Sequence, residues 1–443
     1  MPENRSYESG SDYIIKSVKI KKNGSTVEIR NNVVQIEVFE NLNLPYLTAR
    51  LYLKDDSRIF DTVSFDGVEI CEIIFSQPST SPNSILKTFV IKSVSDTVKI
   101  GDLDEAVSLY LIEKIGYDGS LERFSKSYTG TPLEIVNKIA SDRLKIKINP
   151  PSVTPIQREM RVVIPYMTPL EAIAFVLERM TTAEGLPYYF YSSLNNNILQ
   201  IKSLEELLKT PAWNKGKPYR YSRAFTQSDT NNASVKDPFI VQKYYAPTNG
   251  ENTFGLVTDG AISGQFSVVD FTTGRNETKH FDITKIFKKL ESRGVVPKGL
   301  TQVIETKYSD KKLETLQPVN IHRSTMVNTY EDVRNYYQED TLDFYELDMV
   351  RKAMKSILTK SPINLKVPGS PFLSGTNASI GRQIEYIHLN NDIGAVESPN
   401  ISQEKLRDKK RSGVYMIFSA RHTFFATRHT VELSAVKLGK EPT

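Results

Sequence analysis

Residues 47–55 read LTARLYLKD, and residues 262–270 read ISGQFSVVD. Apolar and polar residues alternate in both stretches, and both end on an aspartate. A period of two with branched and aromatic residues is typical of a half-buried β-strand. The recurrence of nearly the same strand more than two hundred residues later raises the hypothesis that a whole β-domain occurs twice.

Three further pairs of segments follow in the same order, each with a shared apolar spacing. The first interval between blocks is 67 − 47 = 20 residues in one copy and 381 − 262 = 119 in the other, which indicates an insertion after the early strands of the second copy. Surface loops accept long insertions because the entropy of loop closure grows slowly with length. Coincidence is the alternative, since alternating strands look alike. The pairs are GVEICEI (67–73) with GRQIEYI (381–387), FVIKS (89–93) with YMIFS (415–419), and AVSLYL (106–111) with TVELSA (430–435).

A chain of 443 residues is long enough for two to four domains. The content of 22 Tyr and 20 Phe favours strands, and we predict a mainly β protein with α+β insertions. The predicted domains are a first β-domain at 1–113, a small α/β domain with two helices at 114–205, a second, interrupted β-domain at 206–271 and 361–443, and an irregular inserted domain at 272–360.

Two helices are predicted by the tetrapeptide TPLE, at 131–134 and 168–171. Thr at the N-cap accepts a hydrogen bond from a free amide, Pro suits the first helical position, and Glu three residues after the cap bonds back. Further helices are predicted near 282–292 and over 344–359, the latter ending before Ser361-Pro362.

The run Tyr188-Tyr189-Phe190-Tyr191 could stack on sugars or bases, but a strand buried on both sides explains it more simply. It is followed by the turn-prone Asn195-Asn196-Asn197 and by ILQI (198–201), which favours a hairpin.

The net charge of +5 is small for this length. The densest basic run, Lys405, Arg407, Lys409, Lys410 and Arg411, is interpreted as a solvated loop, with an acidic partner surface as the alternative. The single cysteine, Cys71, excludes an intrachain disulfide and is expected to be a small buried apolar residue in a strand. The polar N-terminus does not read as a signal peptide, and no apolar run approaches a membrane span, so we expect synthesis in a reducing compartment and no direct membrane insertion.

No catalytic constellation is recognisable. The sequence has no glycine-rich phosphate loop, GxSxG or HExxH motif, and only five His. His422 and His429 flank a predicted hairpin turn and could face each other, yet a zinc site would need further ligands, so we interpret them as ordinary strand residues. Carboxylates are plentiful, but none is marked as a glycosidase pair. We therefore assign no catalytic, cofactor-binding or metal residue, and expect no cofactor and no enzymatic activity.

The order of these features resembles the baseplate hub proteins of contractile-tailed bacteriophages. The likeness is carried by the two TPLE helices and by four stretches of sequence, and it is weakest over 272–343. The stretches are FENLNLPYLTARLYLKD (39–55), FDGVEICEIIF (65–75), the run from the predicted helix 344–359 through INLKVPGSPFLSG (363–375), and SGVYMIFSARHTF (412–424) with HTVELSAVKLG (429–439).

This resemblance implies two tube-like antiparallel β-barrel domains in one chain, the second interrupted by an insertion. It implies a homotrimer whose six barrels form a pseudo-sixfold ring, a symmetry adaptor between the sixfold tail tube protein and the trimeric central spike protein. It also implies contacts with baseplate wedge and tape measure proteins, and genome DNA passing through the channel without specific binding. The protein would be made in the host bacterial cytoplasm and reside in the virion, at the tail baseplate.

Three rival functions remain open at this stage. One is the hub of a related contractile injection particle. A tail-tip cell-wall glycan hydrolase or glycan-binding adhesin predicts an acidic cleft with aromatic walls. A nucleic-acid-binding β-protein predicts salt-sensitive DNA binding. For the preferred interpretation, aspartate at Leu51 or Phe266 should unfold one barrel. The segments 272–343 and 390–412 match nothing in the resemblance.

Overall fold

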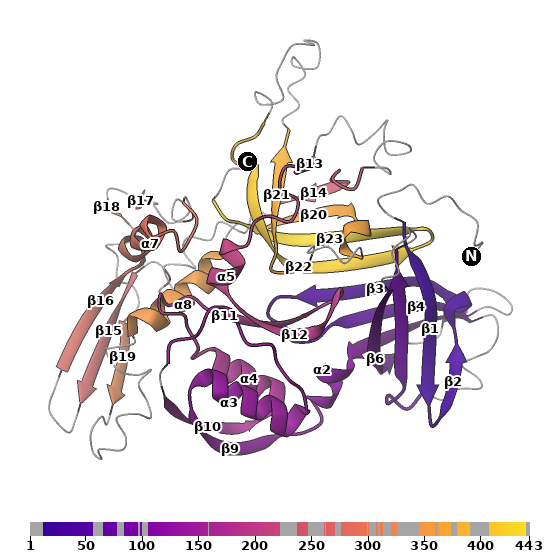
Figure 1. The fold of residues 1–443 in the computed structure, drawn as a ribbon, viewed down its shortest axis with the longest axis horizontal. Helices are drawn as coiled ribbons and strands as arrows, with labels where there is room; N and C mark the ends of the chain where they lie inside the picture. Colours follow the sequence, from indigo (N-terminus) through magenta and orange to yellow (C-terminus); the bar gives the residue numbers. More distant parts are fainter. Residues whose placement is uncertain are drawn as a thin grey trace, which may run out of the picture.

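The computed structural model describes residues 12–55, 65–77, 84–95, 98–99, 105–157, 159–221, 237–246, 261, 263–270, 276–298, 300, 307–308, 311–312, 320–325, 345–358, 362–373, 379–389 and 407–439. The fold is mainly β, as predicted. A 14-stranded sheet dominates it, with a small helical domain beneath and a three-stranded sheet at the far edge (Figure 1).

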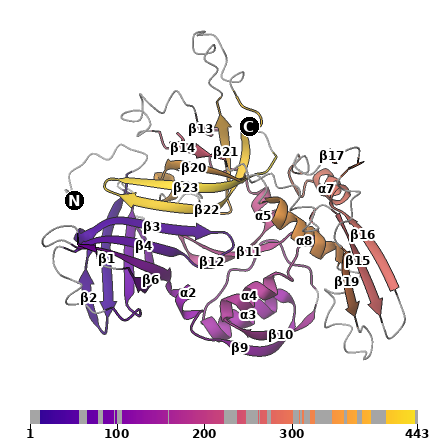
Figure 2. The ribbon, with the colours of Figure 1, turned by 180° about the vertical axis from the view of Figure 1, so that it is seen from behind.

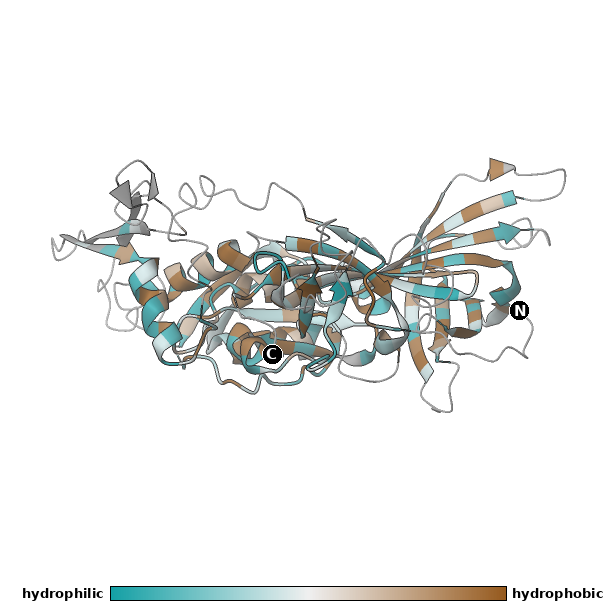
Figure 3. Ribbon diagram, turned by 90° about the horizontal axis from the view of Figure 1, so that it is seen from above, coloured by the Kyte–Doolittle hydropathy of each residue, from teal (hydrophilic) through white to brown (hydrophobic). Residues whose placement is uncertain are grey.

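The first copy of the predicted β-domain forms one half of the large sheet. Its strands lie in the order β3-β4-β8-β6-β5-β1-β2, with β7 also paired to β8. Apolar residues alternate with polar ones along them, and the apolar faces enclose one core that includes Leu51, Leu109 and Cys71 (Figure 3). The elements are β1 (Ile14–Lys22), β2 (Ser25–Glu28), the 3₁₀ turn η1 (Arg30–Asn32), β3 (Val33–Asn41), β4 (Thr48–Asp55), β5 (Ile70–Ser76), β6 (Ser84–Val94), β7 (Val98–Lys99) and β8 (Glu105–Glu113).

The second copy forms the other half, in the order β14-β20-β23-β22-β21-β13. Five strands therefore recur with the same neighbours and the same chain order: β3, β4, β5, β6 and β8 correspond to β14, β20, β21, β22 and β23. The elements are β13 (Tyr219–Tyr221), β14 (Lys243–Tyr245), β20 (Pro362–Pro368), η9 (Ser370–Phe372), β21 (Gln383–His388), β22 (Gly413–Phe425) and β23 (Arg428–Lys437).

The pairing register supports this correspondence at a β-bulge. The register of β6 on β8 shifts between Ile91 and Ser93, and that of β22 on β23 shifts between Ile417 and Ser419. These are matched positions of FVIKS and YMIFS. A bulge inserts one residue and bends its strand, so it is specified by structure and not by chance alternation. This block of the sequence repeat corresponds residue for residue.

The other two late blocks also fall on equivalent strands. Val94 lies opposite Leu109, and Ala420 lies opposite Leu433, which is the alignment of AVSLYL with TVELSA. The remaining block is shifted by one residue. Cys71 pairs with Phe89, and the sequence match would place Glu385 opposite Tyr415. In the structure Ile384 takes that position.

The opening match of the repeat is wrong. The strand β15 (Ser263–Asp270) lies outside the large sheet and pairs with β16 (Asn276–Asp282) and, in parallel, with β19 (Asn320–Thr325). The true counterpart of LTARLYLKD is β20, since Leu51 lies opposite Leu109 and Leu365 lies opposite Leu433. Any half-buried strand shows the same alternation, which is why the two were confused. The insertion therefore follows β14, and the predicted range 206–271 includes a strand that is not part of the second copy.

The two copies join into one continuous sheet through β22. Its first half pairs with β21, and its second half pairs with β3, from Ser419–Asn41 to Phe425–Gln35. Phe424 thereby enters the core of the first copy, where its ring centroid lies 4.8 Å from that of Phe75 and 5.1 Å from that of Tyr13. We call this pairing of β3 with β22 the internal joint.

The small domain lies beneath the joint, with α3 and α4 covering the two-stranded antiparallel sheet of β9 and β10 (Figure 2). Both TPLE predictions are confirmed: Thr131 with Glu134, and Thr168 with Glu171, form complete capping boxes. The elements are α2 (Lys114–Asp118), β9 (Phe124–Gly130), α3 (Pro132–Ile139), the π-helical turn η2 (Ala140–Leu144), β10 (Met160–Met167), α4 (Pro169–Leu177), β11 (Tyr188–Ser193), β12 (Asn196–Ser203) and α5 (Leu204–Lys209).

The insertion carries the three-stranded sheet and both of its predicted helices. Val350 and Met354 share an apolar cluster with Leu365, so the second of these helices is anchored on the core of the second copy. The further elements are α7 (Ile283–Ser292), β17 (Lys307–Tyr308), β18 (Lys311–Lys312) and α8 (Tyr345–Leu358). The rest of 272–343, and 390–406 of the loop before β22, lie outside the described residues.

Candidate interaction surface

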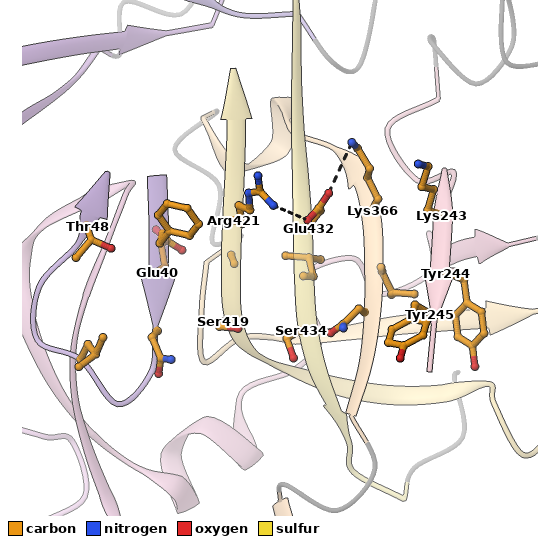
Figure 4. A pocket seen from close by; sticks show the side chains of 17 residues that line it. Glu40, Thr48, Lys243, Tyr244, Tyr245, Lys366, Ser419, Arg421, Glu432 and Ser434 are labelled. Atoms are coloured by element: carbon orange, nitrogen blue, oxygen red, sulfur yellow. Dashed lines mark ion pairs between the residues drawn. The ribbon is translucent and has the colours of Figure 1, made fainter. Parts of the chain in front are cut away.

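One face of the large sheet carries a row of charged and aromatic side chains that crosses both copies. Successive side chains of a strand point to opposite faces of the sheet. In β20, β22, β23, β3 and β4, every second residue points into the core, and the residues between them point to this outer face. Paired residues line up across the strands, as Lys243, Lys366, Glu432 and Arg421 show (Figure 4). We call this face the charged face.

Ion pairs order the middle of the charged face. Arg421 forms an ion pair with Glu37 and lies 3.6 Å (Nη1 to Oε2) from Glu432, whose Oε1 is 3.7 Å from Lys366 Nζ. Glu37 is nearly fully buried, and the hydrogen bond to it raises the pKa of the Arg421 guanidinium. These contacts cross from the first copy to the second, so they fix the charged face as one surface.

The first-copy half of the charged face is aromatic. The Arg50 guanidinium lies over the rings of Tyr52 and Tyr110, at 4.6 and 4.7 Å from their centroids, which is a cation–π arrangement. At the other end, Tyr245 is 63% exposed. A groove of about 640 Å³ runs between β14 and β3 over this face (Figure 4). Its floor presents the paired charges of Arg421, Glu432 and Lys366.

The predicted pair of histidines does come together. His422 on β22 and His429 on β23 are buried, with Nδ1 of the former 3.2 Å from Nε2 of the latter. Glu40 approaches His422 at 3.6 Å, and Gly369 closes over the His429 ring. Among the described residues no group of three His, Cys, Asp or Glu is placed to hold a metal.

Stability should depend on pH through this pair. Burial, then the neighbouring His422, lowers the pKa of His429 well below its usual value. The unfolded chain then binds the proton more readily, so the unfolding free energy falls as pH drops below about 6.5, by about 1.4 kcal/mol per pH unit until the folded pKa is reached. Urea denaturation at pH 7.5 and 5.5 measures this. His429→Gln should lose about 1.4 kcal/mol of that dependence, and parallel pH curves for the two proteins would contradict the assignment.

A second buried polar cluster holds the hairpin β11-β12 on the first copy. Lys87 Nζ donates to the carbonyl oxygens of Ser193 (2.8 Å) and Asn196 (2.9 Å), and Glu40 accepts from the Leu194 amide. Burial lowers the pKa of Lys87, against the opposing effect of Glu113 at 3.6 Å. These groups bind backbone atoms and position a hairpin.

The remaining sequence predictions are placed as follows. All four aromatic residues of 188–191 are buried, so the run is a strand packed on both sides. Cys71 is a buried free thiol whose pKa is raised to about 12 by burial. Of the predicted basic run, Lys409, Lys410 and Arg411 are exposed in a turn before β22, as expected of a solvated loop. Arg407 is half-buried and forms a β-bridge with Leu389, and Lys405 lies outside the described residues. Within the described part of the chain, no helix is both long and apolar enough to cross a membrane.

Comparison with known proteins agrees with this architecture. No family model matches the sequence, and no curated protein matches it. A solved tail protein from Neisseria meningitidis MC58 is similar at 12% identity with a TM-score of 0.53, covering 97% of this chain and 98% of that one. The 43 kDa tail protein of prophage MuSo2 from Shewanella oneidensis is similar at 11% identity with a TM-score of 0.52, covering 96% and 98%.

The chain has the fold of a phage tail protein. The predicted resemblance is thus confirmed at the level of the fold, over nearly the whole chain. The internal joint and the charged face could not be predicted from local sequence patterns. The joint depends on which strand edges meet, and no pattern within a few residues encodes that pairing. The register of the repeat was the one signal in the sequence that could have located it.

Proposed function

We propose that this chain is the structural baseplate hub of a phage tail, a trimer that joins the sixfold tail tube to the trimeric central spike. The observation that carries the proposal is the five-strand unit that recurs within one continuous sheet. Three chains with two such units present six quasi-equivalent surfaces, so a threefold body can match a sixfold tube.

The charged face fits the role of a channel lining. It crosses both copies, and its charges are largely paired with one another, which gives a polar surface without a specific ligand. Genome DNA would pass over it without sequence-specific contacts. The tube protein, the spike protein and further baseplate chains would bind the rims, and the hub would act without catalysis in the virion.

The aromatic run that could have stacked on sugars is buried in β11, so it does not support the rival glycan-binding function. The same symmetry match would serve the hub of a related contractile injection particle. The partner chains, and not this fold, would distinguish that role from the phage hub.

Native mass spectrometry tests the proposal. We expect the 50.2 kDa chain to give a species of three copies, alone or with the spike chain, and the complex to bind tube subunits in multiples of six. Monomers or dimers in every mixture would contradict it. Clearing of peptidoglycan by the purified chain would favour the hydrolase instead.

A further inference from the structure

A second groove, of about 460 Å³, lies between the first copy and the small domain. Its walls come from β6, from the end of β8 and the start of α2, from the loop after η2, and from the hairpin β11-β12. Figure 2 shows α2 next to β6, with the small domain beside it. Among the described residues, none lines both this groove and the groove on the charged face, so the two are separate surfaces. We call the second one the inter-domain groove.

One wall of the inter-domain groove is a strand with a neighbour on one side alone. β5 pairs with β6 from Ser84 to Val90, whereas β8, on the other side, pairs with it only from Phe89 to Val94. Within the described part of the chain, residues 84–88 therefore have one strand neighbour. The groove lies between this part of β6 and residues 113–115, where β8 ends and α2 begins. A strand edge of this kind is able to pair with an extended peptide through backbone hydrogen bonds.

The inter-domain groove has an apolar lining that reaches the solvent. Leu86 is 43% exposed and belongs to none of the three buried apolar clusters of the described residues. Ile115 and Ile146 are half-buried, and Leu199 is buried at the bottom of the same groove. These side chains come from both domains, and an aliphatic group placed among them would leave water on all sides. The groove therefore favours a ligand that carries an aliphatic group.

The charges around this apolar lining are mainly positive. Glu113 is the one carboxylate among the described lining residues, and it is engaged: Oε2 accepts from the Leu47 amide at 2.9 Å, and Oε1 lies 3.6 Å from Nζ of the buried Lys87. Lys114 and Lys147 are exposed at the groove. Lys114 forms an ion pair with Asp118, but both side chains are about half exposed, and such a pair is weak. The groove therefore favours a negatively charged ligand.

We propose that the inter-domain groove binds an extended acidic segment of a partner chain. The segment adds to the free side of β6, packs an aliphatic side chain against Leu86 and pairs a carboxylate with Lys147. A peptide fits this site better than a lipid, because its backbone pairs with the strand edge, whereas an alkyl chain leaves those groups without a partner. This contact goes beyond the symmetry role of the hub and does not depend on the proposed trimer.

Two labelled hexapeptides test the chemistry of the groove on the full chain. The probes are acetyl-VEVDVE-amide and its charge-reversed counterpart acetyl-VKVKVK-amide, which carry the same fluorophore. By fluorescence anisotropy at about 50 mM salt, we expect the acidic peptide to bind at least about tenfold more tightly than the basic one, and the preference to shrink at about 500 mM salt, because salt screens exposed charges. Equal affinity for the two peptides, or no binding of either, would overturn the proposal.

Variants of the lining locate the bound peptide. Leu86→Asp removes the apolar contact and repels the acidic peptide, so we expect its affinity to fall at least about tenfold. Because Leu86 is partly exposed, thermal melting should be unchanged; the matched control is Leu121→Asp, a leucine that is 69% exposed outside the groove, which should bind the peptide as the wild type does. Lys147→Glu should also weaken binding, whereas Lys217→Glu, at another exposed lysine, should not.

The remaining outcomes separate this proposal from its rivals. Unchanged affinity in both Leu86→Asp and Lys147→Glu would place the peptide elsewhere and overturn the proposed contact. Tighter binding of dodecanoate than of the acidic peptide would assign the groove to a lipid carboxylate and also overturn it. A chain that forms trimers but shows no preference for the acidic peptide would leave the hub proposal intact, whereas a monomeric chain that binds this peptide in the groove would contradict the hub proposal alone.

Discussion

Replacing Leu51 by aspartate is expected to unfold the first copy of the β-domain. The Leu51 side chain has no exposed surface and lies between Ile36 on β3 and Leu109 on β8. A carboxylate there would lie among the apolar side chains of this core and lose its hydration, so the cost is on the order of 4 kcal/mol or more. Urea denaturation followed by circular dichroism measures it.

Val34→Asp is the matched control, because Val34 on the adjacent strand is 46% exposed. It should change the unfolding free energy by less than about 1 kcal/mol. If the two variants melted alike, Leu51 would not be a core residue.

The equivalent change in the second copy is Leu365→Asp, with a similar expected loss. The sequence had indicated Phe266 for this test, but its strand belongs to the three-stranded sheet, and its side chain lies outside the described residues. Hydrogen exchange resolved by segment should show β20 and β23 losing protection in Leu365→Asp, and β4 and β8 losing it in Leu51→Asp.

The second large effect is expected from Gly369→Ala. A Cβ atom on Gly369 would lie 2.3 Å from Nδ1 of His429, well inside contact distance. The backbone of Gly369 is ordinary (φ −96°), so the penalty is steric and not conformational. Overpacking a buried site of this kind costs about 1–3 kcal/mol.

A double-mutant cycle isolates that contact. In a His429→Ala background the Gly369→Ala change should become nearly neutral, giving a coupling free energy of about 1–3 kcal/mol. Additive losses in urea denaturation would mean that the strain arises elsewhere.

Local structure was largely predictable from the sequence, because it depends on neighbours in the chain. The capping boxes at Thr131 and Thr168, the helix α8 and the aromatic strand β11 all follow from spacing and turn chemistry within a few residues. The late blocks of the repeat were recognised for the same reason: the aromatic-x-Ile-x-Ser pattern reflects a bulge that each copy needs.

Long-range pairing was not predictable in the same way. β14 has only three residues, Lys243–Tyr245, too few to show a period, and its equivalence to β3 appears only from its partner in the sheet. The strand β15 alternates as regularly as β4 does, so the sequence matches it with β4 in place of β20, the true counterpart. The internal joint joins residues nearly four hundred positions apart, and nothing near either strand signals it.

The strand β22 serves two cores along a single run of thirteen residues. A hinge between the two halves of the large sheet would have to break this strand in its middle, so thermal motion should leave their relative angle almost unchanged. A mechanical force on one half of the sheet is transmitted to the other half through the continuous backbone of β22. The hydrogen bonds between β22 and β3 share this force, because they are loaded in shear. The pair should therefore behave as one stiff plate, and a body assembled from such plates would keep its shape under mechanical stress.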